Sequence, residues 1–239
     1  MKLLHLMASP RGEMSNTMKI SQSFLDGLAA AHADVEVETV DLYHHDLPAV
    51  AGLNIEAKYT LMLGQPIDRD HAESWSHIER AIAQFLSADA YLVTSPMWNF
   101  TIPYVLKYYI DCIVQPGYVF RYDEMGRPVP LVHGKKMVCV TSRGGDYSPG
   151  TPFHAYDFQE PYLRAIFGFI GITDVDFINA QPMDITPDLR EIASRSAIER
   201  ATALAADPGW ADLTEERLSR AAGGSDVEPA DHGHSAAVV

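Results

Sequence analysis

Short apolar segments alternate with amphipathic helical patterns along most of this 239-residue chain, and this alternation constrains the fold more than any other feature. Each apolar segment has the length and the Val, Ile, Leu or aromatic content of a buried strand. Strands are expected at 2–8, 35–42, 90–95, 136–141 and 174–180, and helices at 16–31, 72–87, 103–113, 162–170 and 187–204. Because crossovers between parallel strands are right-handed, this order predicts an α/β fold in which helices cover both faces of a parallel sheet.

The number of strands narrows the topology further. Five strands with a ligand-type loop directly after the first strand favour the flavodoxin-like order 2-1-3-4-5 over the six-stranded dinucleotide-binding order. Apolar residues make up 47% of the chain, which is enough to bury a full core. We therefore expect a flavodoxin-like three-layer domain at 1–206, with a five-stranded parallel sheet, and a partly disordered C-terminal tail at 207–239.

Two internal segments fall outside the regular alternation. Residues 44–69 form a long connection that contains two prolines and two glycines, and they are candidates to cover the functional site or a partner subunit. Residues 116–133 hold three aromatic side chains and a turn signal at 123–126. This second segment predicts a small hairpin or flap.

Charge and composition exclude several classes of function. The chain has 32 acidic and 18 basic residues, and the formal charge of −14 argues against nucleic acid as a main partner. Local positive charge at Arg11 or Arg143 is still compatible with one small anion. Cys112 and Cys139 form no Cys-x-x-Cys pair, which predicts reduced thiols in a cytoplasmic protein. No membrane insertion is expected, because no apolar run is long enough, and no metal site is expected, because the close histidine pairs lack nearby cysteines.

The first polar loop, residues 9–17, lies between the first strand and the first helix. A helix start presents unpaired N–H groups and the positive end of the helix dipole, so a phosphate is stabilised there without a dedicated basic residue. Hydroxyl groups add donors, and an arginine can pair bidentately with an anion. The alternative is an ordinary turn in which a serine or asparagine only caps the helix. The candidate ligands are Ser9, Arg11, Ser15, Asn16 and Thr17.

Two more polar loops follow the third and fourth strands. One offers flat apolar surface and an amide for a ring edge, and it consists of Pro96, Met97, Trp98, Asn99 and Phe100. The other exposes backbone N–H groups that suit carbonyl oxygens, and it consists of Ser142, Arg143, Gly144 and Gly145. Each loop alone also fits ordinary packing, capping or a plain turn. Because the expected order places strands one, three and four side by side, the three loops together predict a flavin mononucleotide (FMN) site.

Several stretches of the sequence, in the same order along the chain, resemble the FMN-dependent NADH-azoreductase family of flavodoxin-like quinone reductases. The resemblance covers roughly residues 3–180 and is strongest at 96–103, 117–122, 134–145 and 161–175. It implies that the first loop holds the FMN phosphate through Ser9, Ser15, Asn16 and Thr17, and that residues 97–100 and 142–145 hold the isoalloxazine ring. It also implies a homodimer with FMN at the interface, where Tyr122 and Phe167 border the substrate space. The family commonly has Tyr where Trp98 stands and usually lacks the run at 10–12.

A flavin site of this kind predicts an oxidoreductase that needs no catalytic acid or nucleophile from the protein. Flavin N5 would take a hydride from NADH or NADPH and pass it to a quinone or azo compound that enters the same space, which predicts ping-pong kinetics. The alternative is a flavodoxin-type, non-catalytic electron carrier, because the acidic charge suits docking to basic redox partners. The sequence lacks the phosphatase Cys-x5-Arg, the hydrolase Gly-x-Ser-x-Gly and a complete P-loop.

Overall fold

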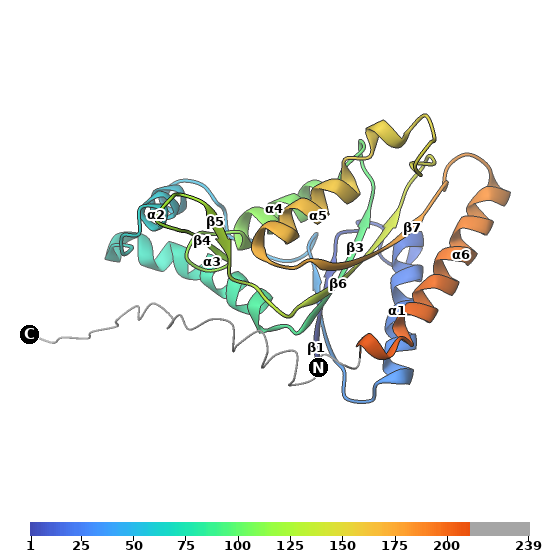
Figure 1. Cartoon of the computed structure of the whole chain (residues 1–239), viewed down its shortest axis with the longest axis horizontal. Helices are drawn as coiled ribbons and strands as arrows, with labels where there is room; N and C mark the ends of the chain where they lie inside the picture. Colours follow the sequence, from blue (N-terminus) through green and yellow to red (C-terminus); the bar gives the residue numbers. More distant parts are fainter. Residues whose placement is uncertain (211–239) are drawn as a thin grey trace, which may run out of the picture.

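The computed structural model describes residues 1–210 of the chain (Figure 1). Its main sheet has five strands, all parallel, in the order β2-β1-β3-β6-β7. Their bounds are Glu36–Asp41 for β2, Lys2–Met7 for β1, Ala90–Pro96 for β3, Lys136–Ser142 for β6 and Asp174–Ala180 for β7. Counted along the chain without the short strands β4 and β5, this is the order 2-1-3-4-5, so the predicted topology is confirmed.

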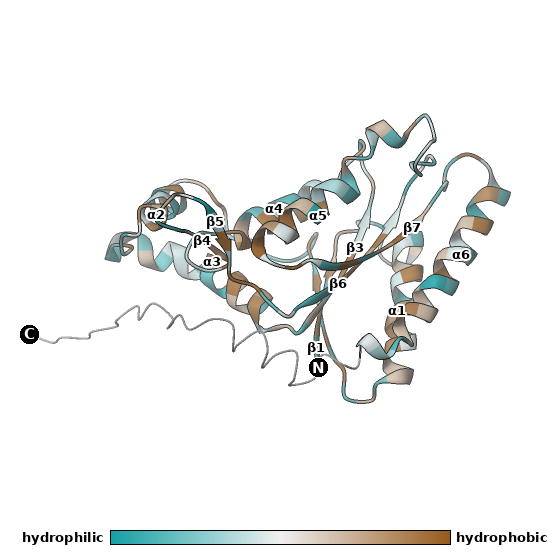
Figure 2. Ribbon diagram, in the orientation of Figure 1, coloured by the Kyte–Doolittle hydropathy of each residue, from teal (hydrophilic) through white to brown (hydrophobic). Residues whose placement is uncertain are grey.

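Helices cover both faces of the sheet and bury two apolar clusters against it. Helices α1 and α6 pack on one face, and α3, α4 and α5 pack on the other (Figure 1). In β1, Leu3 joins the cluster under α1 and α6 whereas Leu4 joins the cluster on the other face, because successive side chains of a strand point to opposite faces. Figure 2 shows the hydrophobic residues along the central strands. The helix bounds are Asn16–Ala31 (α1), Leu53–Met62 (α2), Arg69–Ser87 (α3), Tyr104–Ile113 (α4), Gln159–Ile170 (α5) and Pro187–Ala205 (α6).

Helices α1 and α6 lie close together and extend the packed domain beyond residue 206. A Cβ on Gly27 of α1 would lie 2.9 Å from the Cβ of Ala205, which shows how near the two helices approach. After α6, Trp210 is fully buried, and its ring lies edge-on to that of Phe24 at 5.2 Å. The packed region therefore reaches Trp210, four residues past the boundary expected from the sequence. The remainder of the expected tail, 211–239, lies outside the described residues.

Both internal segments that interrupt the alternation contain regular structure. Residues 44–69 include helix α2, which the sequence did not predict. Only Asn54 and Ala57 of this helix are buried, so its pattern is too short to stand out. Residues 116–133 form an antiparallel hairpin of β4 (Phe120–Tyr122) and β5 (Pro128–Pro130), as predicted.

Residues 1–210 were expected to contain neither a membrane-spanning helix nor a metal site. No helix within residues 1–210 combines the length and apolar character needed to span a bilayer. In the same residues, no three His, Cys, Asp or Glu side chains are grouped to bind a metal ion.

Cys112 and Cys139 are free and buried, and burial raises the pKa of the Cys112 thiol to about 12. Neither thiol is therefore a nucleophile near neutral pH.

His5 is a buried titratable group in the centre of the sheet. The side chain is 1% exposed, and its Nε2 lies 2.8 Å from the hydroxyl of Thr94, which is in turn 2.6 Å from the hydroxyl of Ser21. Burial lowers the pKa of His5 to about 4. The ring is therefore neutral at pH 7 in the folded protein.

We expect the fold to lose stability through His5 as the pH falls from 6.5 to 4. The unfolded chain binds a proton at His5 in this range whereas the folded chain does not, so the stabilisation is present above pH 6.5 and is lost towards pH 4. The loss attributable to this group is at most about 3 kcal/mol. Denaturant unfolding across this range would measure it. His5→Gln, which does not titrate, should show a smaller loss, and equal losses in both proteins would contradict the assignment.

Candidate functional site

The first polar loop joins helix α1 at a capped N-terminus. The Ser15 hydroxyl accepts a hydrogen bond from the Met18 N–H at 3.3 Å, and it also accepts from the Ser9 hydroxyl at 2.8 Å. Ser15 is therefore a helix cap, which was one of the two interpretations of this loop. The N–H groups of Asn16 and Thr17, in the same turn, have no acceptor among the described residues. A helix start with free N–H groups stabilises a bound anion.

Two hydrogen bonds join the three polar loops at one edge of the sheet. The Thr17 hydroxyl lies 2.6 Å from the Ser142 hydroxyl, which connects the start of α1 with the end of β6. The Met97 N–H donates to the Ser142 carbonyl at 2.8 Å, which connects the end of β3 with the same residue. The loops after β1, β3 and β6 therefore meet, as the expected strand order required.

Residues 98–101 form a tight turn with two left-handed residues at its centre. Trp98 and Thr101 exchange both backbone hydrogen bonds, at 2.9 and 3.0 Å, while Asn99 and Phe100 have φ values of 47° and 70°. Asparagine adopts this conformation readily, but phenylalanine in it costs about 1–2 kcal/mol. Backbone strain of this kind clusters at binding sites. The turn presents Trp98 and Phe100, 39% and 41% exposed, as apolar surface.

The two glycines of the third loop leave backbone groups free beside the end of β6. The Gly144 carbonyl accepts from the N–H groups of Met183 at 3.1 Å and Asp184 at 3.0 Å, so the segment after β7 holds this loop in place. A Cβ on Gly144 would lie 3.0 Å from Oδ2 of Asp184, and this close approach favours glycine. Within residues 1–210, the N–H groups of Gly144 and Gly145 have no acceptor. They are available to the carbonyl oxygens of a planar ligand.

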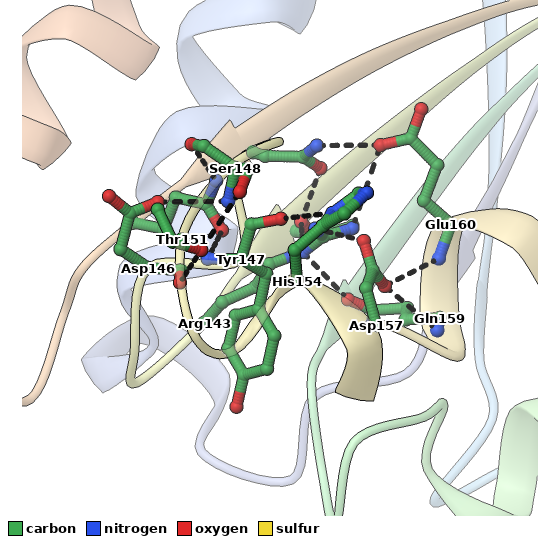
Figure 3. A network of polar contacts seen from close by, with 12 residues as sticks. Arg143, Asp146, Tyr147, Ser148, Thr151, His154, Asp157, Gln159 and Glu160 are labelled. Atoms are coloured by element: carbon green, nitrogen blue, oxygen red, sulfur yellow. Dashed lines mark hydrogen bonds and ion pairs between the residues drawn. The ribbon is translucent and has the colours of Figure 1, made fainter.

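The Arg143 side chain lies inside a polar network behind these loops (Figure 3). It is 1% exposed, and Nη1 donates to Asp157 at 2.8 Å while Nε donates to Thr141 at 3.1 Å and to Gln159 at 3.2 Å. Burial lowers the pKa of Arg143, and Asp157 and Glu160 oppose that shift, so the guanidinium keeps its charge. Of the two arginines that the sequence left open as partners for a small anion, Arg143 is buried and already pairs with two carboxylates, so its side chain is directed to the protein interior.

Gln159 extends the network to the end of β3. It is fully buried, and its Nε2 donates to the carbonyls of Pro96 at 3.1 Å and Ser95 at 3.3 Å. On the other side, Asn179 of β7 donates to Glu160 at 2.8 Å. The network therefore fixes the start of α5 to the ends of β3, β6 and β7.

The remaining predicted residues lie in different surroundings. Arg11 is exposed within the first loop, and Tyr122 is 44% exposed on β4. Phe167 is instead fully buried among the core side chains on the inner side of α5. The structure corrects the expectation that Phe167 borders the substrate space. Its helical spacing is the same for a core residue as for a pocket wall.

Three aromatic residues beside the loops were not predicted as site residues. Tyr147 and Phe153 flank Gly145, because a Cβ on that glycine would lie 3.5 and 3.6 Å from their rings. The ring of Tyr156 lies 5.3 Å from that of Phe100. Tyr147 lies two residues after Gly145, and this closeness to a predicted loop could have identified it as a site residue. Phe153 and Tyr156 come later in an irregular segment, for which no periodic pattern exists.

A further aromatic contact comes from the end of β2. The ring of Tyr43 lies 6.3 Å from that of Trp98 and 5.8 Å from that of Tyr104. Its hydroxyl is buried and has no hydrogen-bond partner among the described residues, and burial raises its pKa. Tyr43 lies two residues after β2, a strand that neighbours β1, and this position was the signal that could have identified it.

Comparison with known proteins associates the whole packed domain with one family. A family model described as "Flavodoxin-like fold" matches residues 1–204. The FMN-dependent NADH:quinone oxidoreductase of Nostoc punctiforme is 42% identical over 205 residues, which cover 84% of this chain and 98% of that protein. The protein of the same name from Nitratidesulfovibrio vulgaris is 36% identical over 204 residues, which cover 85% of this chain and 97% of that protein.

Solved structures give the same result. The azoreductase from Bacillus anthracis str. Sterne superimposes with a TM-score of 0.77 at 30% identity, covering 86% of this chain and 98% of that structure. An FMN-dependent NADH-azoreductase from Bacillus anthracis str. Ames Ancestor, solved in complex with FMN, gives a TM-score of 0.74 at 28% identity, with coverages of 85% and 99%. The chain therefore belongs to the flavodoxin-like oxidoreductase family that includes these FMN-dependent NADH:quinone oxidoreductases and azoreductases.

Proposed function

We propose that this protein is an FMN-dependent oxidoreductase that transfers two electrons from NADH or NADPH to a quinone or an azo compound. One observation carries the proposal: three loops at one sheet edge combine free N–H groups at a helix start, an apolar turn and a second pair of free N–H groups. When bound, FMN supplies the centre that accepts hydride from the nicotinamide and passes it to the acceptor. The names of the relatives support the same activity.

The residues present fit the two ends of this cofactor. At the start of α1, the Asn16 and Thr17 N–H groups and the Ser9 and Ser15 hydroxyls would hold the phosphate, with Arg11 exposed nearby. At the ring, residues 96–100 would supply apolar contact and the amide of Asn99, while Ser142 and the backbone of 143–145 would hold the polar edge. Donors already fixed in position stabilise negative charge at that edge without reorganisation.

We infer further that electron donor and acceptor occupy the same space in turn. Trp98 and Phe100 offer one apolar surface beside the glycine loop, and a planar nicotinamide and a planar acceptor both suit it. Initial rates at several fixed acceptor concentrations should then give parallel double-reciprocal lines. Intersecting lines would indicate that both substrates bind together.

The resemblance and the buried cysteines support a proposal for the biological unit and the compartment. We propose that residues 1–210 form the FMN-binding domain of a homodimer, with Tyr122 close to the substrate space. Both free cysteines are buried, which suits the reducing cytoplasm. Sedimentation of the full chain would test the dimer.

The decisive experiment is the visible spectrum of the purified protein with added FMN, followed by NADH under anaerobic conditions. An oxidised-flavin spectrum that bleaches with NADH and returns with a quinone would support the proposal. Bound flavin that neither nicotinamide bleaches would favour the flavodoxin-type electron carrier. Absence of flavin uptake would overturn the cofactor assignment.

We expect Asn99→Gly to reduce quinone turnover by about tenfold or more while changing stability by less than about 1 kcal/mol. Glycine keeps the positive φ of this position and removes only the side-chain amide, whereas alanine would add backbone strain. Steady-state kinetics and denaturant unfolding of the FMN-loaded protein would separate the two effects. A parallel loss of stability and turnover would count against a ring-edge role for Asn99.

A further inference from the structure

Three exposed aromatic side chains gather in the segment between β6 and α5. We call this group the aromatic shelf, and it consists of Phe153, Tyr156 and Phe158, which are 48%, 48% and 55% exposed. In Figure 1 the segment leads into the first turn of α5, at the carboxyl edge of the sheet. A cluster of half-exposed aromatic rings keeps apolar surface in water, which is typical of a binding site.

The shelf is continuous with two of the loops assigned to FMN. Tyr156 lies on Phe100 with ring centroids 5.3 Å apart and planes inclined by 32°. The N–H of Phe158 donates to the Phe100 carbonyl at 3.0 Å. Phe153 borders Gly145, because a Cβ there would lie 3.6 Å from its ring. The apolar surface of these loops therefore continues into the aromatic shelf, and a flat molecule bound over the loops could contact both.

Hydrogen bonds hold the shelf in place despite its exposure (Figure 3). The ion pair between Arg143 and Asp157 fixes the chain between Tyr156 and Phe158. The His154 Nδ1 lies 3.0 Å from the Tyr147 carbonyl, which fixes the opposite end. The rings are thus positioned before any ligand arrives, and a pre-organised surface binds without an ordering cost.

We propose that the aromatic shelf is a subsite for the second ring system of the electron acceptor. This inference rests on the proposed function and adds a substrate class: fused two-ring quinones and diaryl azo compounds over single-ring quinones. The ring of Tyr156 lies 5.3 Å from that of Phe100 and 6.5 Å from that of Phe153, so an acceptor whose first ring lies on Phe100 would bring a second ring against Tyr156 and Phe153. Stacking of the second ring on these side chains strengthens binding of the larger acceptor.

The test compares 2-methyl-1,4-naphthoquinone with 1,4-benzoquinone in FMN-loaded wild type and variants. Tyr156→Ala and Phe153→Ala should each lower the ratio of kcat/KM for the two-ring acceptor to that for the one-ring acceptor by about three- to tenfold. The ratio cancels changes in the reaction with NADH. Ile192→Ala is the control, because Ile192 is 60% exposed on α6, which packs on the opposite face of the sheet from α5. Its ratio should equal that of wild type.

The outcomes separate this inference from the proposed function. An unchanged ratio in a variant that still bleaches with NADH would overturn the subsite and leave the function intact. A wild type that does not bleach with NADH would overturn the function itself. If Tyr156→Ala instead weakens self-association in sedimentation and leaves the ratio unchanged, the shelf is an interface between copies and the subsite is overturned.

Discussion

Replacing Arg143 with methionine should lower the free energy of unfolding by about 3–5 kcal/mol. The guanidinium is 1% exposed and pairs with Asp157, whose side chain is 8% exposed, at 2.8 Å. Its Nη2 also lies 3.8 Å from Glu160. Methionine fills similar volume but leaves a buried carboxylate without its cation, and this uncompensated charge causes most of the loss.

The effect should reach the site, because the same network holds the segment that contacts Phe100. Chemical denaturation would measure stability, and FMN titration would measure the cofactor Kd. Arg195→Met is the matched control, because Arg195 pairs with Glu191 on the exposed face of α6 and such pairs contribute about 0.5 kcal/mol. Similar losses in the two variants would contradict the buried-charge explanation.

A second substitution keeps this prediction testable if the single variant does not fold. Adding Asp157→Asn to Arg143→Met removes the unpaired charge and should restore at least about 1 kcal/mol relative to the single variant. A double variant no more stable than Arg143→Met would show that packing, and not charge, explains the loss.

The fold could be predicted because its signals are local. The three inner strands β1, β3 and β6 are short apolar runs, and β1 carries the alternation that faces two helix layers. The three loops could be located for the same reason, since each follows a strand directly. Helix α2 escaped prediction because only Asn54 and Ala57 are buried along it.

What could not be predicted depends on contacts between residues distant along the chain. Arg143 follows a strand like a site residue, but its partner Asp157 comes from a later segment with no periodic pattern. The positive φ of Phe100 is equally invisible, because phenylalanine does not favour that conformation. Phe167 was predicted to border the substrate space but lies in the core. The sequence could not separate these two positions, because core residues and pocket-lining residues of an amphipathic helix recur with the same spacing.

Substituting alanine for Gly171 should destabilise the protein by at least about 3 kcal/mol, whereas Gly168→Ala should stabilise it by up to about 1 kcal/mol. Gly171 ends α5 with a φ of 111°, and a Cβ there would overlap the carbonyl oxygen of Val132. That oxygen cannot move aside, because Val132 is buried and its N–H donates to the Ile170 carbonyl at 3.0 Å.

Gly168 makes the comparison sharp because it belongs to the same helix. A Cβ on Gly168 would meet no heavy atom within 4 Å, and its φ is helical, so alanine there removes only the flexibility of glycine. Thermal and denaturant unfolding should therefore shift in opposite directions for one chemical change three residues apart. If Gly171→Ala yields too little folded protein, the double variant Gly168→Ala/Gly171→Ala can be measured instead. It should be more stable than Gly171→Ala by no more than the small gain expected from Gly168→Ala. Equal shifts at the two glycines would mean that α5 does not end against the carbonyl oxygen of Val132 as described.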